Sequence, residues 1–222
     1  MQRPNEISVV IVEDHRMFRE QLRHLIEKAD DMKVCGEADN IRDGFALIRQ
    51  TQPSVAIVDI TLKGSSGLEL LKDLRAHGID VPVLVLSMHD ESLYAERALR
   101  AGARGYVTKH EASADVMQAI RHISKGEIYL KPQFMSRMMG RMVTGGEIHV
   151  RPIDRLADRE LEVFELIGRG LTTREIAAQL GLGITTVDTY RTRIREKLNL
   201  ENAARLRFAA SRWVQLGEEP TA

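Results

Sequence analysis

The sequence predicts two domains of different fold class: a doubly wound, five-stranded parallel α/β domain, followed by a separate all-α domain of four helices. Over about the first 130 residues, short and nearly continuous apolar runs alternate with longer amphipathic segments, which is typical of a parallel sheet covered by helices on both faces. From residue 154 onward no strand is needed, because helical segments follow one another directly. We therefore expect domains at residues 1–130 and 153–222, with residues 131–152 as a linker.

Five apolar runs are expected to form the strands. They lie at residues 7–12, 34–35, 55–58, 83–86 and 106–107. Each run is followed by a segment whose apolar residues recur at helical spacing, as Leu68, Leu71 and Leu74 do after the third run. Five strand–helix units in about 125 residues make a small doubly wound domain.

The linker interrupts this alternation. Lys131-Pro132, Gly145-Gly146 and Pro152 are residues typical of connecting segments. Between them, apolar residues spaced four apart predict a short helix with an apolar stripe: Phe134, Met138 and Met142, with Met135, Met139 and Val143. We expect the stripe to pack on one of the two domains, and the alternative is a methionine-rich groove for a partner.

The C-terminal domain has the layout of a helix-turn-helix. Gly168 ends its first helix, a capping box of Thr172 and Glu175 opens the second, and Thr185 is expected to cap the third, which runs to Leu198. A glycine-rich turn separates the second helix from the third. In this layout the third helix is the one that reads DNA.

Side chains with charged or reactive groups follow the predicted strands. Glu13 and Asp14 come directly after the first strand, Asp59 after the third, Ser87 after the fourth and Lys109 shortly after the fifth. Ligand sites of open α/β sheets lie beyond the carboxyl ends of the strands, so we expect these side chains to meet. Three carboxylates in one crevice repel one another unless a cation lies among them, and Mg²⁺ prefers such oxygen ligands.

This set of residues suggests phosphoryl chemistry. Asp59 could attack phosphorus, Lys109 could neutralise the phosphoryl group, and Ser87 could donate a hydrogen bond to it. Any single carboxylate could instead cap the helix that follows it, but five such side chains at the strand ends favour a site. Tyr106, on the last strand, could be a plain core residue or a moving element.

These residues resemble the receiver domain of two-component response regulators over residues 6–126: Glu13-Asp14, Asp59, Ser87, Tyr106 and Lys109. The resemblance implies a flavodoxin-like fold and phosphorylation of Asp59 by a sensor histidine kinase. It also implies that Asp14, Asp59 and the backbone carbonyl of Thr61 hold Mg²⁺, with Glu13 assisting through bound water. Ser87 and Tyr106 would shift together when the phosphate arrives.

The residues after Asp59 bear on two further points. Lys63 stands where the family usually has proline, which affects the expected rigidity of the loop and the lifetime of the phosphate. Phosphatases of the haloacid dehalogenase type also use an aspartate after an apolar strand, but they need a second acid two residues later, and here that residue is Thr61. We therefore expect a phosphoacceptor with at most slow self-dephosphorylation, and not an enzyme.

Charge is distributed unevenly along the chain although it sums to zero. The 32 basic and 32 acidic residues, taken together, do not suggest a nucleic-acid partner. Residues 1–129 carry 17 basic and 20 acidic side chains, whereas residues 185–212 carry seven basic and three acidic ones. A solvated helix face would look similar, but this positive segment begins at the predicted third helix, where a recognition helix belongs.

The C-terminal domain resembles the LuxR-type helix-turn-helix domain over residues 153 to about 215. The resemblance rests on residues 156–163 and 175–177, with Thr186-Val187, Ile194 and Lys197-Leu198. Together with the receiver it implies a response regulator of the NarL/FixJ type, in which the polar face of the third helix meets DNA. The last helix, from Asn202 to near Trp213, can serve as a dimer contact in that family, or it packs on the core of its own domain.

Three groups of residues are expected to contact DNA. Those at helix N-termini suit phosphate oxygens: Thr172, Thr173, Arg174, Thr185 and Thr186. Those expected to hold the DNA backbone electrostatically are Arg191, Arg195 and Lys197. Candidates for base edges are Asp188, Thr189, Thr192 and Arg193. Asp188 could also cap the third helix together with Thr185, and we expect this cap in preference to a contact with a cytosine amine.

We expect a cytoplasmic, phosphorylation-gated transcription regulator whose partners are double-stranded DNA, a sensor histidine kinase and a second copy of the chain. Cys35 is the only cysteine, no apolar run approaches 18 residues, and the first residues lack the apolar stretch of a signal peptide. Two alternatives stand beside this expectation. One is a phosphate-independent DNA-binding regulator with a vestigial receiver site, and the other is a signalling module whose helical domain binds only protein.

Overall fold

The computed structural model describes residues 6–88, 91–110, 113–136 and 151–220. The chain divides into two compact units, Met1–Thr144 and Gly145–Ala222, and the division falls inside the predicted linker. Residues 132–136 are helical. The rest of the predicted linker stripe (Met138, Met139, Met142 and Val143) lies outside the described residues, so the helix predicted there is tested only at its start.

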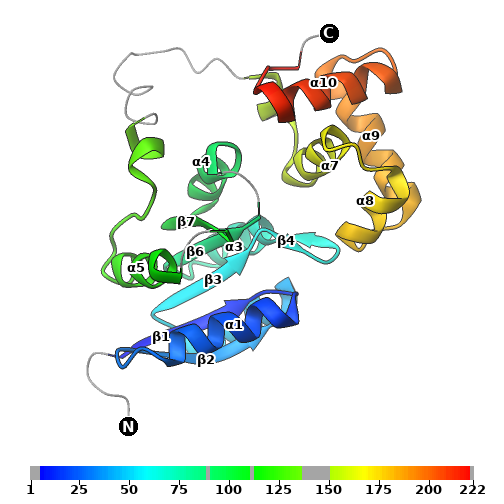
Figure 1. The fold of residues 1–222 in the computed structure, drawn as a ribbon. Coiled ribbons are helices and arrows are strands. Elements are labelled where there is room, and N and C mark those ends of the chain that lie inside the picture. The colour runs from blue at the N-terminus through cyan, green and yellow to red at the C-terminus, as the bar shows by residue number, and fades with distance from the viewer. Residues whose placement is uncertain (1–5, 89–90, 111–112, 137–150, 221–222) are drawn as a thin grey trace. The chain divides into compact units, whose positions relative to one another are not determined.

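The first unit is a five-stranded parallel sheet with helices on both faces, and this confirms the predicted α/β fold (Figure 1). Its strands are β1 (Ile7–Val12), β2 (Met32–Ala38), β3 (Val55–Asp59), β6 (Val83–Ser87) and β7 (Gly105–Thr108). Its helices are α1 (Arg16–Glu27), α2 (Ile41–Thr51), α3 (Gly67–Ala76), α4 (Glu91–Ala101) and α5 (Ser113–Ser124). The strand order β2-β1-β3-β6-β7 places the carboxyl ends of β1 and β3 side by side, where the winding of the sheet reverses.

Both faces of the sheet are covered by apolar side chains. Val9 and Ile11 point to one face, where they share a cluster with Ile26 of α1 and Ile120 of α5. The alternate residue Val12 points to the other face, against α2. Because the central strands are buried on both sides, polar groups of the sheet are confined to the strand ends, and the functional residues lie there.

The second strand is longer than the sequence indicates. Only Val34-Cys35 was expected, whereas β2 spans Met32–Ala38. β2 lies at the edge of the sheet and pairs with β1 alone, so most of its side chains are only partly buried. An edge strand of this kind need not be continuously apolar, and its sequence signal is therefore weak.

A small hairpin begins two residues after Asp59. It consists of β4 (Thr61–Leu62) and β5 (Ser65–Ser66), which pair antiparallel across the turn Lys63-Gly64. The chain then returns so closely to β3 that a Cβ atom on Gly67 would lie 1.9 Å from the carbonyl oxygen of Asp59. Glycine is therefore required there, and the hairpin is held against the end of the strand that carries Asp59.

The second unit is all-α, which confirms the predicted class of the C-terminal domain. A short 3₁₀ segment, η1 (Pro152–Arg155), precedes four helices. These are α7 (Asp158–Gly168), α8 (Thr173–Leu180), α9 (Ile184–Leu198) and α10 (Ala203–Leu216). Phe164 and Trp213 pack together in its core, with ring centroids 5.4 Å apart.

Of the two predicted caps around the turn, one is present and one is wrong. The Thr172 N–H donates to Glu175 Oε2 (2.7 Å) and the Glu175 N–H donates to Thr172 Oγ1 (3.3 Å), which confirms the capping box of α8. Thr185 does not cap α9, because the helix begins one residue earlier, with Gly183 in the capping position. Thr185 is consequently inside the first turn, and its predicted capping pair with Asp188 does not form.

No helix among the described residues has both the length and the apolar character needed to cross a membrane.

Gly168 is predicted to be essential for the packing of α7 on α10. A Cβ atom there would lie 2.4 Å from the carbonyl oxygen of Ala210, so Gly168→Ala must push the two helices apart. We expect the free energy of unfolding of the second unit to fall by about 1–3 kcal/mol. Trp213 is the only tryptophan of the chain, so its fluorescence during urea denaturation measures this unit.

Gly183→Ala is the control for the exchange of glycine for alanine, and because Gly183 is the N-cap of α9 we expect it to cost below about 1 kcal/mol. Gly183 has φ −73°, and a Cβ atom there would meet only Thr186 Oγ1, at 3.5 Å. An unchanged midpoint for Gly168→Ala, or an equal loss in both variants, would show that the close approach of α7 to α10 is not needed.

Candidate functional site

The carboxyl ends of β1 and β3 bring together a cluster of acidic side chains. Glu13, Asp14, His15 and Asp59 each offer one possible ligand atom, and these atoms all lie within 4.8 Å of one another. Glu13 and Asp59 are 1% and 3% exposed, respectively. The sequence does not single out His15, whose only signal is that it follows Glu13 and Asp14 directly.

Lys109 places a positive charge among these carboxylates. Its Nζ lies 2.6 Å from Glu13 Oε2 and 2.8 Å from Asp59 Oδ2. The same ammonium group lies 4.6 Å from the centroid of the Phe18 ring, which contributes a cation–π contact. The Lys109 N–H donates to the carbonyl oxygen of Ser87 (2.8 Å), so the residue is fixed to the end of β6.

The charges in this crevice are not balanced. Three carboxylates face one ammonium group, and burial further disfavours the ionised form of Asp59. Burial, with a smaller contribution from the neighbouring Glu13, raises the pKa of Asp59 from 3.8 to about 6, although Lys109 acts in the opposite direction. A further positive charge would therefore stabilise this cluster of carboxylates.

Within this acidic cluster, two buried carboxylate oxygens have no hydrogen-bond partner: Asp14 Oδ1 and Asp59 Oδ1. His15 Nδ1 lies 2.9 Å from Asp14 Oδ1 without the geometry of a hydrogen bond, and it lies 3.1 Å from Glu13 Oε1. Unpartnered buried carboxylate oxygens are costly unless a cation meets them. The donor set fits a hard divalent cation such as Mg²⁺, which prefers carboxylate and carbonyl oxygens.

Of the remaining predicted receiver residues, Ser87 and Thr61 lie at the same end of the sheet, whereas Tyr106 pairs with Val85 in the middle of β6. Ser87 ends β6 and is fully buried, and Thr61 is the second residue after Asp59. Tyr106 is 1% exposed on β7, so its side chain is in the interior of the unit. The roles of Ser87 and Tyr106 in switching, and of the Thr61 carbonyl as a metal ligand, stay predictions.

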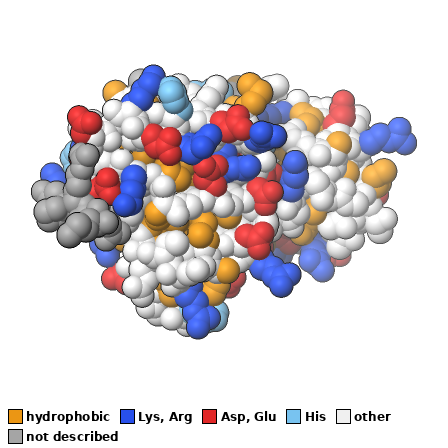
Figure 2. Space-filling model, turned by 90° about the horizontal axis from the view of Figure 1, so that it is seen from below, with side chains coloured by type: hydrophobic (Ala, Val, Ile, Leu, Met, Phe, Trp, Pro, Cys, Tyr) orange, Lys and Arg blue, Asp and Glu red, His pale blue; other side chains and the backbone are white. Residues whose placement is uncertain are grey.

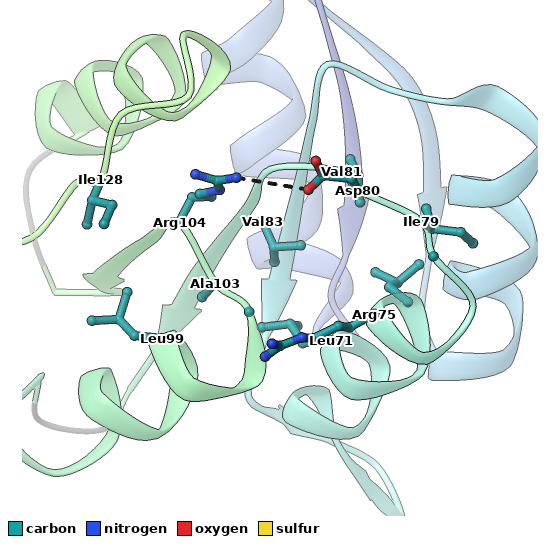
Figure 3. A pocket seen from close by; sticks show the side chains of 13 residues that line it. Leu71, Arg75, Ile79, Asp80, Val81, Val83, Leu99, Ala103, Arg104 and Ile128 are labelled. Atoms are coloured by element: carbon teal, nitrogen blue, oxygen red, sulfur yellow. Dashed lines mark ion pairs between the residues drawn. The ribbon is translucent and has the colours of Figure 1, made fainter.

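A separate groove of about 560 Å³ lies at the opposite end of the sheet (Figure 3). Its walls include Leu71, Val83 and Ala103. At its rim, Arg104 Nη2 lies 4.0 Å from Asp80 Oδ1. Val83 begins β6 and Arg104 immediately precedes β7, so the groove is at the amino ends of these strands. It takes no part in the acidic cluster.

In the second unit, α9 presents a polar face with a shallow groove. The residues that line this groove are Thr185, Asp188, Thr189, Thr192, Arg193 and Glu196. The opposite side of α9 carries Val187, Ile194 and Leu198 into the core. The Thr189 hydroxyl donates to the carbonyl oxygen of Thr185 (2.9 Å) and that of Thr192 to Asp188 (3.1 Å), so both hydroxyls already have partners within the helix.

The other predicted DNA contacts differ in how available they are. Arg174 and Thr186 are exposed, and Thr173, Arg191 and Arg195 are half-buried. The Thr172 hydroxyl donates to Glu175 Oε2 (2.7 Å) as part of the α8 cap. Exposure alone does not show which of these residues contact DNA, so the contacts stay predictions.

Lys197 has an intramolecular partner that the sequence does not indicate. Its Nζ lies 2.6 Å from Glu160 Oε2, and the same oxygen accepts the N–H of Ala157 (2.8 Å). Glu160 thus connects the start of α7 to the end of α9. The ammonium group is already part of an ion pair, so Lys197 holds the orientation of α9 in addition to its predicted contact with phosphate.

The surface also reflects the zero net charge of the chain. On the face drawn in Figure 2, basic and acidic side chains lie side by side and do not form a large patch of one sign. Because the net charge is zero, electrostatic attraction of a nucleic acid depends on a local excess of basic side chains, such as the seven basic against three acidic residues at 185–212.

Two family models match the chain. Residues 9–121 match the response regulator receiver domain, and residues 154–209 match the luxR family of bacterial regulatory proteins. Each range lies within one of the two structural units, and the ranges contain the acidic cluster and α9, respectively.

Relatives and solved structures extend the similarity to almost the whole chain. The virulence transcription regulator BvgA of Bordetella pertussis is 35% identical over 92% of this chain and 97% of its own length. The response regulator GacA of Pseudomonas aeruginosa is 31% identical over 93% of this chain and 96% of its own. RcsB of Salmonella enterica serovar Typhimurium, solved bound to the rprA promoter with phosphomimetic BeF₃⁻, has 25% identity, a TM-score of 0.60 and coverage of 93% and 99%.

Asp59→Asn is predicted to stabilise the metal-free chain at neutral pH. Because the pKa of Asp59 is raised to about 6 in the folded state, the folded chain binds the proton more tightly than the unfolded chain. Ionisation therefore costs stability as the pH rises from about 4 to above 6. We expect the variant to gain on the order of 2 kcal/mol at pH 7.5 in the presence of a chelator, with the gain disappearing towards pH 4.

Urea denaturation followed by circular dichroism at several pH values measures this difference. Asp80→Asn is the control, because Asp80 is exposed at the other end of the sheet. A gain that does not depend on pH, or no gain at pH 7.5, would contradict the assignment of the burial cost to Asp59.

Proposed function

Because the chain belongs to the response-regulator family, with a receiver domain followed by a LuxR-type DNA-binding domain, we propose that phosphorylation of Asp59 controls its binding to promoter DNA. The observation that carries this proposal is the buried Asp59 carboxylate, which has one unpartnered oxygen and one oxygen 2.8 Å from the Lys109 ammonium group. A nucleophile, its counter-ion and a cluster of further acidic ligands thus lie together at one end of the sheet.

The chemistry follows from these positions. An oxygen of Asp59 attacks the phosphorus of a phosphohistidine on a sensor kinase, so an O–P bond forms and the P–N bond breaks. The imidazole leaves as the neutral ring with the electron pair of the P–N bond, and it keeps the proton already on its other nitrogen. Lys109 neutralises charge on the phosphoryl oxygens, and the Ser87 hydroxyl donates to one of them. Asp14, Asp59 and the Thr61 carbonyl would hold Mg²⁺, which supplies further positive charge when it is bound.

Turnover of free substrates is not part of this proposal. A phosphatase that uses an aspartate nucleophile needs a second acid to protonate the leaving group. The second residue after Asp59 is Thr61, whose side chain cannot supply that proton. We therefore propose a phosphoacceptor that dephosphorylates itself slowly at most.

Phosphate on Asp59 would act by shifting an equilibrium that already exists between two arrangements of the receiver. Ser87 and Tyr106 lie on the neighbouring strands β6 and β7, so a movement of the first towards the phosphate could be followed by the second. The result would be dimerisation of the chain and release of the helical unit for DNA, in the cytoplasm and under the control of a sensor histidine kinase.

The polar face of α9 is the proposed DNA-reading surface. Arg191 and Arg195 would contact phosphates, and Arg193 and Asp188 would meet base edges. Because Gly183 is the N-cap of α9, the Asp188 carboxylate is not used in a cap. This favours its alternative role, in which it accepts a hydrogen bond from a cytosine amine. RcsB, which matches this chain over most of its length, was solved with promoter DNA bound, and this supports a DNA ligand here.

The phosphoacceptor is tested by incubation with a small phosphodonor and Mg²⁺. We expect one acid-labile phosphate per chain, measured by intact mass, and none in Asp59→Asn. Asp80→Asn, which changes an exposed aspartate at the other end of the sheet, should be labelled normally. Persistent labelling of Asp59→Asn would remove Asp59 from this role.

The DNA interface is tested by selecting DNA sequences with and without phosphodonor. Arg191→Ala is expected to weaken binding to all sequences and to reduce the slope of log K against log salt by about 1. Arg193→Ala is expected to relax preference at one base pair, by about 1–3 kcal/mol.

The same selection distinguishes the alternatives. Equal affinity with and without phosphodonor would favour a phosphate-independent regulator, and no selected sequence at all would favour a helical unit that binds only protein. Similar effects of Arg191→Ala and Arg193→Ala on every sequence would contradict the division between backbone and base contacts.

A further inference from the structure

We infer that the backbone amide of Lys63 positions the Asp14 carboxylate for the divalent cation, which makes Lys63 a positioning residue of the acidic cluster. This inference rests on the proposed phosphoacceptor function and adds to it a group outside the expected ligand set. It concerns the N–H of Lys63 and not its exposed side chain.

The contact joins two segments that are 49 residues apart in the sequence. The Lys63 N–H donates to Asp14 Oδ2 at 3.0 Å. The other oxygen of the same carboxylate, Oδ1, is buried and accepts no hydrogen bond, although His15 Nδ1 lies 2.9 Å from it. Asp59 Oδ1 is likewise buried and has no hydrogen-bond partner. One oxygen of Asp14 is therefore tied to the backbone, while the other is left for a ligand in the cluster.

The amide is presented by a rigid support. Lys63 and Gly64 form the two-residue turn between β4 and β5, with Gly64 at φ +76°. On either side of the turn, Leu62 and Ser66 are fully buried, and the Gly67 N–H closes the loop on the Ile60 carbonyl oxygen at 2.7 Å. The position of the donor is therefore set by the hairpin, which itself begins two residues after Asp59.

A fixed hydrogen bond on one oxygen affects cation binding in two ways. It restricts rotation of the Asp14 carboxylate, so less conformational freedom is lost when the other oxygen binds the ion. It also disfavours bidentate binding by Asp14, which leaves coordination positions of Mg²⁺ for water and a phosphoryl oxygen. If the amide instead withdrew Asp14 from the ion, its removal would strengthen cation binding, so the two possibilities predict opposite signs.

Proline is the substitution that removes the donor and keeps the turn, and it is also the residue that the family usually has at this position. The hydrogen bond from the Lys63 N–H is therefore one that this chain has in addition to the family's usual cation site. The fixed φ of proline, near −65°, suits the residue that precedes a glycine of positive φ in a two-residue turn. Lys63→Ala is the matched control, because it removes the same side chain and keeps the N–H. Thermal unfolding of both variants without metal shows whether the fold of the receiver is retained.

The experiment measures the Mg²⁺ dissociation constant of the full chain by titration calorimetry, with Mn²⁺ and electron paramagnetic resonance as a second readout. We expect Lys63→Pro to bind about three- to tenfold more weakly than the unsubstituted chain, and Lys63→Ala to bind equally well. Equal binding by Lys63→Pro and Lys63→Ala, tighter binding by Lys63→Pro, or an equal loss in both would overturn the inference.

Amide hydrogen exchange provides a measurement that does not depend on the proline variant. In the metal-free chain the Lys63 amide should be protected, and Asp14→Ala should remove that protection while leaving the rest of the hairpin protected. An unprotected Lys63 amide in the unsubstituted chain would overturn the inference even if Lys63→Pro failed to fold. Absence of Mg²⁺ binding by the unsubstituted chain would overturn the proposed cation site as well, whereas binding that Lys63→Pro leaves unchanged overturns the role of Lys63 alone.

Discussion

Repulsion between carboxylates in a crevice with little solvent is the constraint on which the receiver unit depends. Glu13 and Asp59 are almost fully buried, and Asp14 adds a third negative group within reach of both. Lys109 offsets part of this charge at 2.6 and 2.8 Å. The strand order, the return of the chain at Gly67 and the attachment of Lys109 to the end of β6 all serve to hold these groups together against their repulsion.

The helical unit differs from the receiver, because its buried charges are paired, as Arg159 is with Glu162, and its candidate functional surface is a polar helix face. The ion pair between Glu160 and Lys197 orients the end of α9 relative to the start of α7. The close approach of α7 and α10 at Gly168 builds the core on which α9 rests. The zero net charge of the chain is a sum over segments of opposite sign: residues 1–129 carry 17 basic and 20 acidic side chains, and residues 185–212 carry seven basic and three acidic ones.

The strands and the reactive residues could be predicted because both follow from local sequence: buried parallel strands are continuous apolar runs, and Asp59 or Ser87 marks where each run stops. The edge strand β2 is only weakly indicated by the sequence, because most of its side chains are partly exposed and need not be apolar. The hairpin after Asp59 has two-residue strands, too short for any periodicity. The start of α9 was misplaced because glycine and threonine both cap helices, and only the backbone conformation of Gly183 decides between them. Partners distant in sequence, such as Glu160 with Lys197, leave no local pattern.

The contact between Lys63 and Asp14 has a consequence for how the sequence can vary. A donor that belongs to the main chain is supplied by every amino acid except proline, so position 63 can change its size, charge and polarity without loss of the hydrogen bond. Proline, which the family usually has at this position, is the one residue that cannot supply the donor. The departure of this chain from proline therefore adds a hydrogen bond from the main chain, whatever side chain stands at position 63.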